Sequence, residues 1–385
     1  MNNAPVNTSA EKILIRGVNW IGDAVMSMPA ITALRHCFSE SKISLLTDEK
    51  LLDIWMKHRG LDEVIVFNKT EGIFSVAKKL RERKFDLGIA FPNSHRAAIE
   101  MWLGSVKQRI GYSAFLRSPF LTHSVKPLHR LVKIQKLTPK MVKAIIDGRL
   151  KHPFQIDGKG PVHHIFNYLA LVQFAGAEPK LSEPQIEIQI EETIEAKRKF
   201  KLKNSQKPLI GIIPGAEYGP AKRWLRERFA QTAIALHKKT GCEICIFGGK
   251  ADRLICLEIS SLIKSGVGNN AVVENLAGQT TLRELCAALK LCDVVVSNDT
   301  GPMHIAAAVG TRVVAIFGST SPELTAPGLP GSTRHIIIRS NQKCSPCFLS
   351  NCPIDFRCMR SITVDQVVEA ALKMLQEKSV RRDNG

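Results

Sequence analysis

Residues 17–24, "GVNWIGDA", follow the apolar run "ILIR" and precede a stretch that reads as a helix. Their spacing imitates the phosphate-binding loop G-x4-G-K-[ST], but Asp23 and Ala24 stand where that loop has its lysine and its hydroxyl residue. A carboxylate there would repel a phosphate, so we interpret Asp23 as a general base that accepts a proton from an attacking hydroxyl. The alternative is that Asp23 caps the helix. A dinucleotide site fits badly, because G-x-G-x-x-G is absent.

A second candidate site is the stretch "VVVSNDTGPMHIAAAVG", a strand that turns through Asp299, Thr300 and Gly301 into a helix. Pro302 suits the first turn of that helix, where no backbone N–H is required. The free N–H groups of Thr300 and Gly301 at a helix N-terminus favour a phosphate, and His304 can donate to the same anion. The alternative is that Asp299 only caps the helix and that His304 lies on the surface.

Two further loops leave predicted strands at their carboxyl ends, where α/β sheets bind ligands. In "IIPGAEYGPAKRW", Lys222 and Arg223 concentrate positive charge, and Lys222 suits a diphosphate leaving group. In "IFGGKADR", Asp252 is placed to accept hydrogen bonds from ribose hydroxyls. Solvation of Lys222 and helix capping by Asp252 are the alternatives.

The elements that position these loops follow a repeated β-α pattern, which predicts parallel sheets with helices on both faces. We expect strands at 12–18, 42–48, 63–68, 87–92, 208–215, 242–249, 271–278, 293–299 and 312–318, and helices at 24–38, 51–58, 72–85 and 165–176. A last helix opens with the Thr363-x-x-Gln366 capping box.

The domain organisation follows from the length and from one change in composition. A chain of 385 residues exceeds one ordinary core, and residues 181–206 are rich in Pro, Glu and Lys. We therefore expect a Rossmann-like domain at 1–180, a linker at 181–206 and a second Rossmann-like domain at 207–362. The helix and tail at 363–385 are expected to pack back on the first domain.

The formal charge of +19 is concentrated in residues 101–151, which contain 11 Lys and Arg and only one acidic residue, Asp147. Such a segment attracts nucleic acid, anionic lipid or a phosphorylated substrate, unless it is only a solvated surface. Nucleic acid is disfavoured because no nucleic-acid motif accompanies the charge. No apolar run approaches the ~20 residues that span a bilayer, and the N-terminus lacks a signal peptide's pattern. We expect a cytoplasmic protein.

Four of the ten cysteines form a cluster of spacing C-x2-C-x4-C-x5-C, at Cys344, Cys347, Cys352 and Cys358. Four thiols at this spacing allow a structural metal site, but the spacing matches no common zinc ribbon or ferredoxin. Reduced or redox-sensitive thiols are the favoured interpretation. The other six lie in apolar segments, as buried cysteines do.

Three stretches carry a resemblance to a known family: "NWIGDAVMSMPA", "PGAEYGPAKRW" and "NDTGPMHIAAAVGTRVVAIFGSTSPELTAP". They resemble the ADP-heptose:lipopolysaccharide heptosyltransferases, the second stretch being most like the type II members, and the likeness runs from about residue 12 to 376. It implies a GT-B fold, with two Rossmann-like domains facing each other across a cleft. It also implies inverting transfer of L-glycero-D-manno-heptose from ADP-heptose to the heptosyl-Kdo2-lipid A inner core of lipopolysaccharide. A type I or III acceptor and a non-enzymatic polyanion-binding protein are the alternatives.

The resemblance also implies roles for single residues. Asp23 matches the catalytic base, Lys222 the lysine that contacts the diphosphate and heptose, and Asp299 the acid that binds heptose hydroxyls. The implied donor-binding set is Glu217, Tyr218, Lys222, Asp252, Thr280, Asp299, Thr300, Gly301 and His304, and the implied acceptor-binding set is Asn19, Trp20, Gly22, Asn93 and Arg96. No metal is obligatory, since no D-x-D motif is positioned for one. The basic segment 101–151 would hold the anionic acceptor and touch the anionic inner membrane leaflet peripherally.

Overall fold

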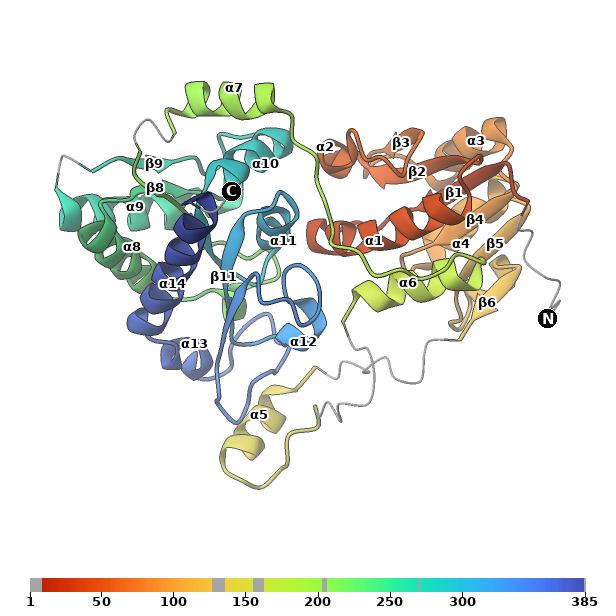
Figure 1. Ribbon diagram of the computed structural model, residues 1–385. Coiled ribbons are helices and arrows are strands. Elements are labelled where there is room, and N and C mark those ends of the chain that lie inside the picture. Colours follow the sequence, from red (N-terminus) through yellow and green to blue (C-terminus); the bar gives the residue numbers. More distant parts are fainter. Residues whose placement is uncertain (1–8, 127–135, 155–162, 203–205, 269–270, 384–385) are drawn as a thin grey trace. The chain divides into compact units, whose positions relative to one another are not determined.

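The computed structural model describes residues 9–126, 136–154, 163–202, 206–268 and 271–383, and Figure 1 shows their arrangement. The chain divides into two compact units. The first consists of Met1–Val132 with Lys159–Glu187, and the second of Lys133–Gly158 with Ile188–Gly385. A two-unit α/β organisation was expected, but the chain passes between the units more often than one linker would allow.

The first unit is built on a parallel sheet of order β3-β2-β1-β4-β5-β6. Its strands are β1 (Lys12–Arg16), β2 (Lys42–Asp48), β3 (Glu63–Phe67), β4 (Leu87–Ala90), β5 (Gln108–Tyr112) and β6 (His123–Val125), and its helices are α1 (Ile21–Cys37), α2 (Leu52–Trp55), α3 (Ile73–Arg83), α4 (His95–Leu103) and α6 (Ile165–Phe174). Ile13, Leu14 and Ile15 are successive and all fully buried, which requires cover on both faces of the sheet.

The second unit repeats the same design, with a parallel sheet of order β12-β11-β10-β7-β8-β9. Its strands are β7 (Leu209–Ile213), β8 (Glu243–Ile246), β9 (Val273–Asn275), β10 (Val294–Asn298), β11 (Arg312–Phe317) and β12 (Ile336–Arg339), and its helices are α5 (Pro139–Ile146), α7 (Ile190–Phe200), α8 (Arg226–Thr240), α9 (Arg253–Val267), α10 (Leu282–Leu291), α11 (Gly301–Ala308), α12 (Pro322–Thr325), α13 (Arg357–Ser361) and α14 (Val364–Asp383). The alternation of strand and helix predicted both sheets.

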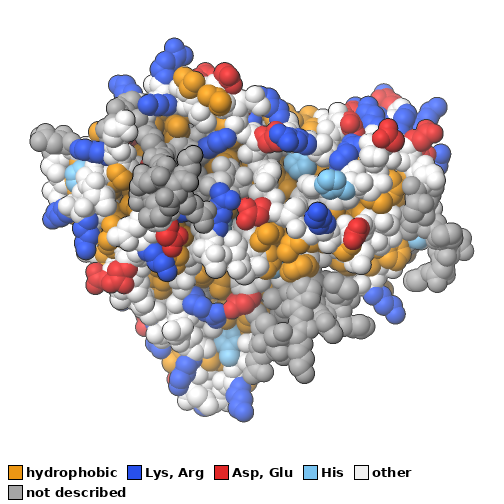
Figure 2. Space-filling model, viewed as in Figure 1, with side chains coloured by type: hydrophobic (Ala, Val, Ile, Leu, Met, Phe, Trp, Pro, Cys, Tyr) orange, Lys and Arg blue, Asp and Glu red, His pale blue; other side chains and the backbone are white. Residues whose placement is uncertain are grey.

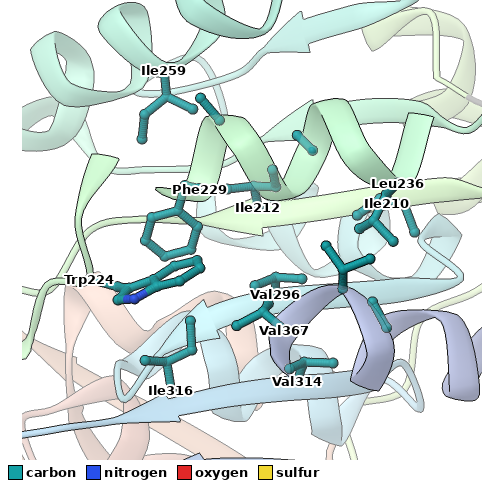
Figure 3. Packing of buried hydrophobic residues seen from close by; sticks show 14 of the residues in the cluster. Ile210, Ile212, Trp224, Phe229, Leu236, Ile259, Val296, Val314, Ile316 and Val367 are labelled. Carbon is teal, nitrogen blue, oxygen red and sulfur yellow. The ribbon is translucent and has the colours of Figure 1, made fainter. Parts of the chain in front are cut away.

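The core of the second unit includes the last helix. Trp224 and Phe229 pack edge to face, with ring centroids 5.1 Å apart, and Val367 of α14 belongs to the same buried cluster (Figure 3). Helix α14 packs on α8, β10, β11 and β12. We expected residues 363–385 to pack on the first domain. They belong instead to the second unit, because the apolar face of α14 completes that unit's core.

A segment from the first half of the sequence also belongs to the second unit. Leu137, Val142 and Ile145 form a buried cluster with Cys344 and Cys347. In Figure 1, α5 (yellow) accordingly lies beside the blue segment that follows β12. The first domain therefore does not run without a break to residue 180, as was expected, because burial of these apolar side chains places α5 in the second unit.

The basic segment 101–151 is divided between the two units. Residues 101–126 lie in the first unit and 136–151 in the second, while 127–135 lie outside the described residues. On the face that Figure 2 displays, Lys and Arg side chains are spread among Asp and Glu side chains.

The expected linker contains a helix. In α7 the carboxylate of Glu192 accepts from the backbone N–H of Gln189, and the Arg283 guanidinium of the α10 helix donates to both of its oxygens, at 2.5 and 2.7 Å. Residues 181–206 were interpreted as a linker because they are highly charged, and these contacts show that the charges serve an amphipathic helix.

Candidate active site

Asp23 lies in the first turn of α1 and does not cap it. The N-cap position is Trp20, and no side chain caps the helix there. Asp23 Oδ1 accepts a hydrogen bond of 3.1 Å from Tyr168 Oη of α6, which packs along α1. The Asp23 side chain keeps 30% of its surface exposed. The structure thus shows a carboxylate that is oriented by a neighbouring helix and open to solvent.

The N-cap residue of α6 and one residue within the helix face this carboxylate, and sequence reasoning missed both. His164 and Tyr168 are one helical turn apart, and His164 Nδ1 lies 3.8 Å from Asp23 Oδ1. Burial raises the pKa of Tyr168 well above its ordinary value, and the charge of Asp23 adds to this. The phenol therefore stays a neutral donor. In the sequence, residues 165–176 carry only the apolar pattern of a helix, so no local signal marks a partner so distant along the chain.

Arg96 and Asn19 have structural partners in the first unit. Glu100 is fully buried and pairs with Arg16 at 2.9 Å and with Arg96 at 2.5 Å. Arg96 also donates to the backbone oxygen of Glu71 at 2.8 Å. Asn19 Oδ1 accepts from Arg16 at 3.4 Å. This buried network joins β1 to α4 and holds the loop before α1.

The other predicted acceptor-binding residues are more open. Trp20 is 53% exposed, with the Lys50 ammonium 5.5 Å from its ring, and Gly22 is partly buried in the first turn of α1. Asn93 Oδ1 accepts from Arg117 Nη1 at 3.0 Å. Arg117 is fully buried, and burial lowers its pKa. In the described part of the chain, no residue is a hydrogen-bond partner of its Nε or Nη2. Sequence reasoning singled out Asn93 but not this guanidinium.

In the second unit, Lys222 and Asp299 form a buried ion pair. Lys222 Nζ lies 2.6 Å from Asp299 Oδ2, and their side chains are 15% and 5% exposed. The hydroxyls of Thr320 and Thr325 also donate to Asp299, at 2.6 and 3.3 Å. Burial alone would raise the pKa of the Asp299 carboxyl, but the ammonium of Lys222 and the Thr320 hydrogen bond bring it below its usual value. Asp299 is therefore an ionised carboxylate.

The two residues meet because β7 and β10 are adjacent parallel strands whose following loops share one edge of the sheet. The amide of Asn298, the last residue of β10, fastens these loops together. Its Oδ1 accepts from the Trp224 N–H at 2.9 Å, and its Nδ2 donates to the Pro214 oxygen at 2.8 Å. Sequence reasoning treated Asn298 only as the end of a strand.

Helix α11 follows this loop with an uncapped N-terminus. Its N-cap is Thr300, and no side chain caps it, so Asp299 serves Lys222 and the two threonines instead. Gly301 and Pro302 open the helix. His304 is buried, at 4% exposure, and the interpretation of it as a surface histidine is wrong.

The loop that carries Lys222 rests on the cysteine segment. Tyr218 Oη donates to the Phe348 oxygen at 2.8 Å, and Ala221 N–H donates to the Ser350 oxygen at 3.0 Å. Lys222 Nζ lies 5.5 Å from the centroid of the Tyr218 ring, and Glu217 is exposed beside it. Residues 344–358 thus support the predicted donor loop, a relation that their spacing did not reveal.

Asp252 and Thr280 lie in neighbouring loops of the same unit. Asp252 Oδ2 accepts from the Gly249 N–H at 3.0 Å, and Oδ1 lies 3.9 Å from Arg223. A Cβ at Gly215 would lie 2.5 Å from the Asp252 carboxylate, so glycine is required for this close approach. Thr280 is partly buried and immediately precedes the N-cap of α10.

The four clustered cysteines are unpaired thiols. Burial raises the pKa of Cys344, Cys347 and Cys358, and the neighbouring thiols add to this. Within the described ranges, no set of three or more His, Cys, Asp and Glu side chains is arranged to hold a metal ion.

Two Rossmann-like parallel sheets in one chain, each bearing polar loops at the carboxyl edge, form the GT-B fold. Within that fold class, the family model "Glycosyltransferase family 9 (heptosyltransferase)" matches residues 73–356, and the chain belongs to this family. It is a glycosyltransferase.

Relatives and solved structures agree with this assignment. The chain is 28% identical to lipooligosaccharide heptosyltransferase 2 of Campylobacter jejuni over 94% of its own length and 99% of the relative. It is 30% identical to that of Haemophilus ducreyi, over 82% and 86%. The structure of Escherichia coli ADP-heptose LPS heptosyltransferase II matches with a TM-score of 0.75 at 24% identity, covering 96% of this chain and 99% of that one. This last likeness shows the fold.

Among the residues that the structure describes, no helix combines the length and the apolar character that crossing a bilayer requires.

Proposed function

We propose that this glycosyltransferase transfers L-glycero-D-manno-heptose from ADP-heptose to heptosyl-Kdo2-lipid A, in the assembly of the lipopolysaccharide core. The family supports heptose as the transferred sugar. The names of the relatives, heptosyltransferase 2, support its addition as the second heptose of the core. The first unit binds the acceptor, and the second binds the sugar nucleotide. The protein acts in the cytoplasm, with peripheral contact to the anionic inner leaflet.

The observation that carries the donor half of this proposal is the ion pair of Lys222 and Asp299 beside the uncapped N-terminus of α11. Lys222 and the free N–H groups at Thr300 and Gly301 stabilise the charge that develops on the leaving diphosphate. Asp299, ionised and held by hydroxyls, has acceptor oxygens that suit the sugar's hydroxyl groups.

In the acceptor half, Asp23 takes the proton from the attacking hydroxyl. That hydroxyl displaces ADP from the anomeric carbon in one inverting step: the new C–O bond forms as the bond to the phosphate oxygen breaks. Tyr168 positions the carboxylate by donating to Oδ1, which leaves Oδ2 to accept the proton. No step requires a metal ion.

The test is transfer by the full chain and by Asp23→Asn, measured by the mass of the product from ADP-heptose and heptosyl-Kdo2-lipid A. Wild type should add one heptose, and Asp23→Asn should lose about 10²–10⁴-fold in rate, the usual contribution of general base catalysis. ADP affinity, measured by calorimetry, should stay within about twofold, because Asp23 does not hold the diphosphate. Loss of ADP binding in this variant would contradict the division of roles.

The acceptor is tested separately. Incubation with Kdo2-lipid A that lacks heptose, and with longer cores, distinguishes type II from type I and type III activity. Turnover of only one of those other acceptors would replace the acceptor named here and leave the donor proposal intact.

A further inference from the structure

Lys136 is an exposed residue that the proposed function does not use. Its Nζ lies 5.1 Å from the centroid of the Tyr218 ring, although the two residues are far apart in sequence. Lys222 Nζ lies 5.5 Å from the same centroid. The two ammonium nitrogens are therefore at most about 11 Å apart. One tyrosine ring thus has two lysines beside it, one from each half of the sequence.

The position of Lys136 is set by its neighbours. Leu137 is 2% exposed, lies in the buried cluster with Cys344 and Cys347, and donates its N–H to the Cys347 oxygen at 3.1 Å. The next residue, Thr138, caps α5. Tyr218 is held by Phe348, which directly follows Cys347. The same loop therefore anchors the backbone beside Lys136 and the ring that Lys136 faces.

The charges at this ring are unbalanced. Asp299 neutralises Lys222, whereas no carboxylate among the described residues pairs with Lys136. Lys136 and Lys222 are separated by about a Debye length at most, so an anion between them would interact with both ammonium groups. The π face of Tyr218 attracts an ammonium group, but it does not neutralise one. An anion placed between the two lysines would neutralise the charge of Lys136.

We propose that Lys136 is a second lysine of a phosphate-binding site centred on Tyr218, and that it binds a phosphoryl group of a substrate together with Lys222. This rests on the proposed function, since that function supplies the phosphorylated substrates. Two substrates could carry the phosphoryl group: the donor, in its diphosphate, and an acceptor with phosphate on its core sugars. The chemistry of recognition is the same for both.

The experiment compares Lys136→Gln with wild type in the full chain. If the group is the donor's diphosphate, the Kd for ADP, measured by calorimetry, should rise about tenfold, as for loss of one charge-assisted contact. If it is the acceptor's phosphate, ADP affinity should not change. The KM for a phosphorylated acceptor should then rise by about the same factor, and that for the dephosphorylated acceptor should stay constant. Either result supports the site and names its source.

Two controls lie on the same segment. Lys140→Gln and Lys143→Gln remove one exposed charge each from α5 and should leave all three constants unchanged. Lys136→Arg keeps a cation and should stay within about threefold of wild type. An equal effect of Lys140→Gln would show that any positive charge on this surface attracts the anion, without a specific binding site. That result would overturn the proposal.

The proposal and the proposed function fail in different ways. If wild type transfers heptose and Lys136→Gln matches it in ADP affinity and in both acceptor constants, the site at Lys136 is refuted and the function stands. If wild type transfers no heptose, the function is refuted, while an effect on ADP affinity would still support Lys136 as a phosphate ligand.

Discussion

Tyr168 donates a hydrogen bond of 3.1 Å to Asp23, from a helix 145 residues further along the chain. Helix α6 packs along α1, so the contact is part of the helix layer that covers the first sheet. The phenol is buried and stays protonated because burial raises its pKa, while the carboxylate is partly open to solvent. The structure therefore holds Oδ1 of Asp23 by a hydrogen bond, while 30% of the side chain stays exposed.

Tyr168→Phe should lower kcat about tenfold and leave the Kd for ADP unchanged. The substitution keeps the ring that packs against Phe91 and removes only the hydrogen bond, which to an ionised partner contributes about 1.5–3 kcal/mol. Steady-state kinetics with ADP-heptose, and calorimetry with ADP, would measure the two effects.

The matched control for this change is Tyr112→Phe. Tyr112 also has a buried phenol, which donates to the Asn167 oxygen at 2.7 Å and not to Asp23. A loss of stability should accompany both variants, but only Tyr168→Phe should slow transfer. Equal kcat values for the two variants would show that the Tyr168 contact has only a structural role.

The fold was largely predictable because parallel strands that are covered on both faces need continuous apolar residues. "ILI" of β1 and "VVV" of β10 meet that condition, and both are strands. The strands β5, β6 and β12 and the helix α7 were missed. The sequence "HSV" of β6 is too short for any periodicity, and the charges of α7 resemble those of a linker. Local pattern does not identify an element whose face is covered by a distant segment.

The site residues that are neighbours in the sequence were predictable. Asp299, Thr300 and Gly301 are adjacent, and their strand-turn-helix pattern indicates their geometry. The partners of the site were not predictable. Tyr168, Thr320 and the loop at Phe348 reach it from elsewhere in the fold, and none of them has a recognisable spacing.

Lys222→Met should reverse the effect of pH on the contribution of Asp299 to stability. In wild type the folded pKa of Asp299 lies below its ordinary value, so its contribution is present above the unfolded pKa and is lost as the pH falls through the folded one. Without Lys222, burial raises that pKa, and the native state then holds a proton that the unfolded chain releases. The free energy of unfolding should therefore fall as the pH rises above about 4.

Thermal unfolding of Lys222→Met at pH 4 and pH 7 would check this. The loss relative to wild type should be larger at pH 7, at about 3–5 kcal/mol, the usual cost of leaving one partner of a buried pair uncompensated. Lys222→Met combined with Asp299→Asn removes both charges and should recover part of that loss. A single variant that is equally destabilised at both pH values would contradict the prediction.

His58→Asn should make the first unit less sensitive to acid. His58 is partly buried, its Nδ1 accepts from the Gly60 N–H at 3.1 Å, and desolvation lowers its pKa from 6.5 to about 4. The unfolded chain therefore binds a proton between pH 6.5 and 4 that the native unit does not, so wild-type stability falls as the pH is lowered through this window. Asparagine offers an oxygen to Gly60 and does not titrate.

Urea unfolding at pH 7 and pH 5, followed by Trp fluorescence, would measure the difference. Trp20, Trp55 and Trp102 lie in the first unit, so the signal reports mainly on that unit. Between the two pH values, the midpoint should fall less in His58→Asn than in wild type. An identical fall in both proteins would assign the acid sensitivity to other groups.

Gly219→Ala should weaken ADP binding without a change in any charge. Gly219 has a φ of +149°, and a Cβ there would lie 2.4 Å from the Ser350 oxygen, which accepts the Ala221 N–H. Backbone on both sides of the contact leaves no flexible side chain to move, so the loop carrying Tyr218 and Lys222 must shift from its support. If that loop grips the diphosphate, the Kd for ADP should rise about tenfold or more, and calorimetry would measure it. Gly148→Ala is the control, since it also places a Cβ on a residue with positive φ, +76°, but nothing lies within 4 Å of the new Cβ. Unchanged ADP affinity in a folded Gly219→Ala would show that the loop does not depend on residues 344–358.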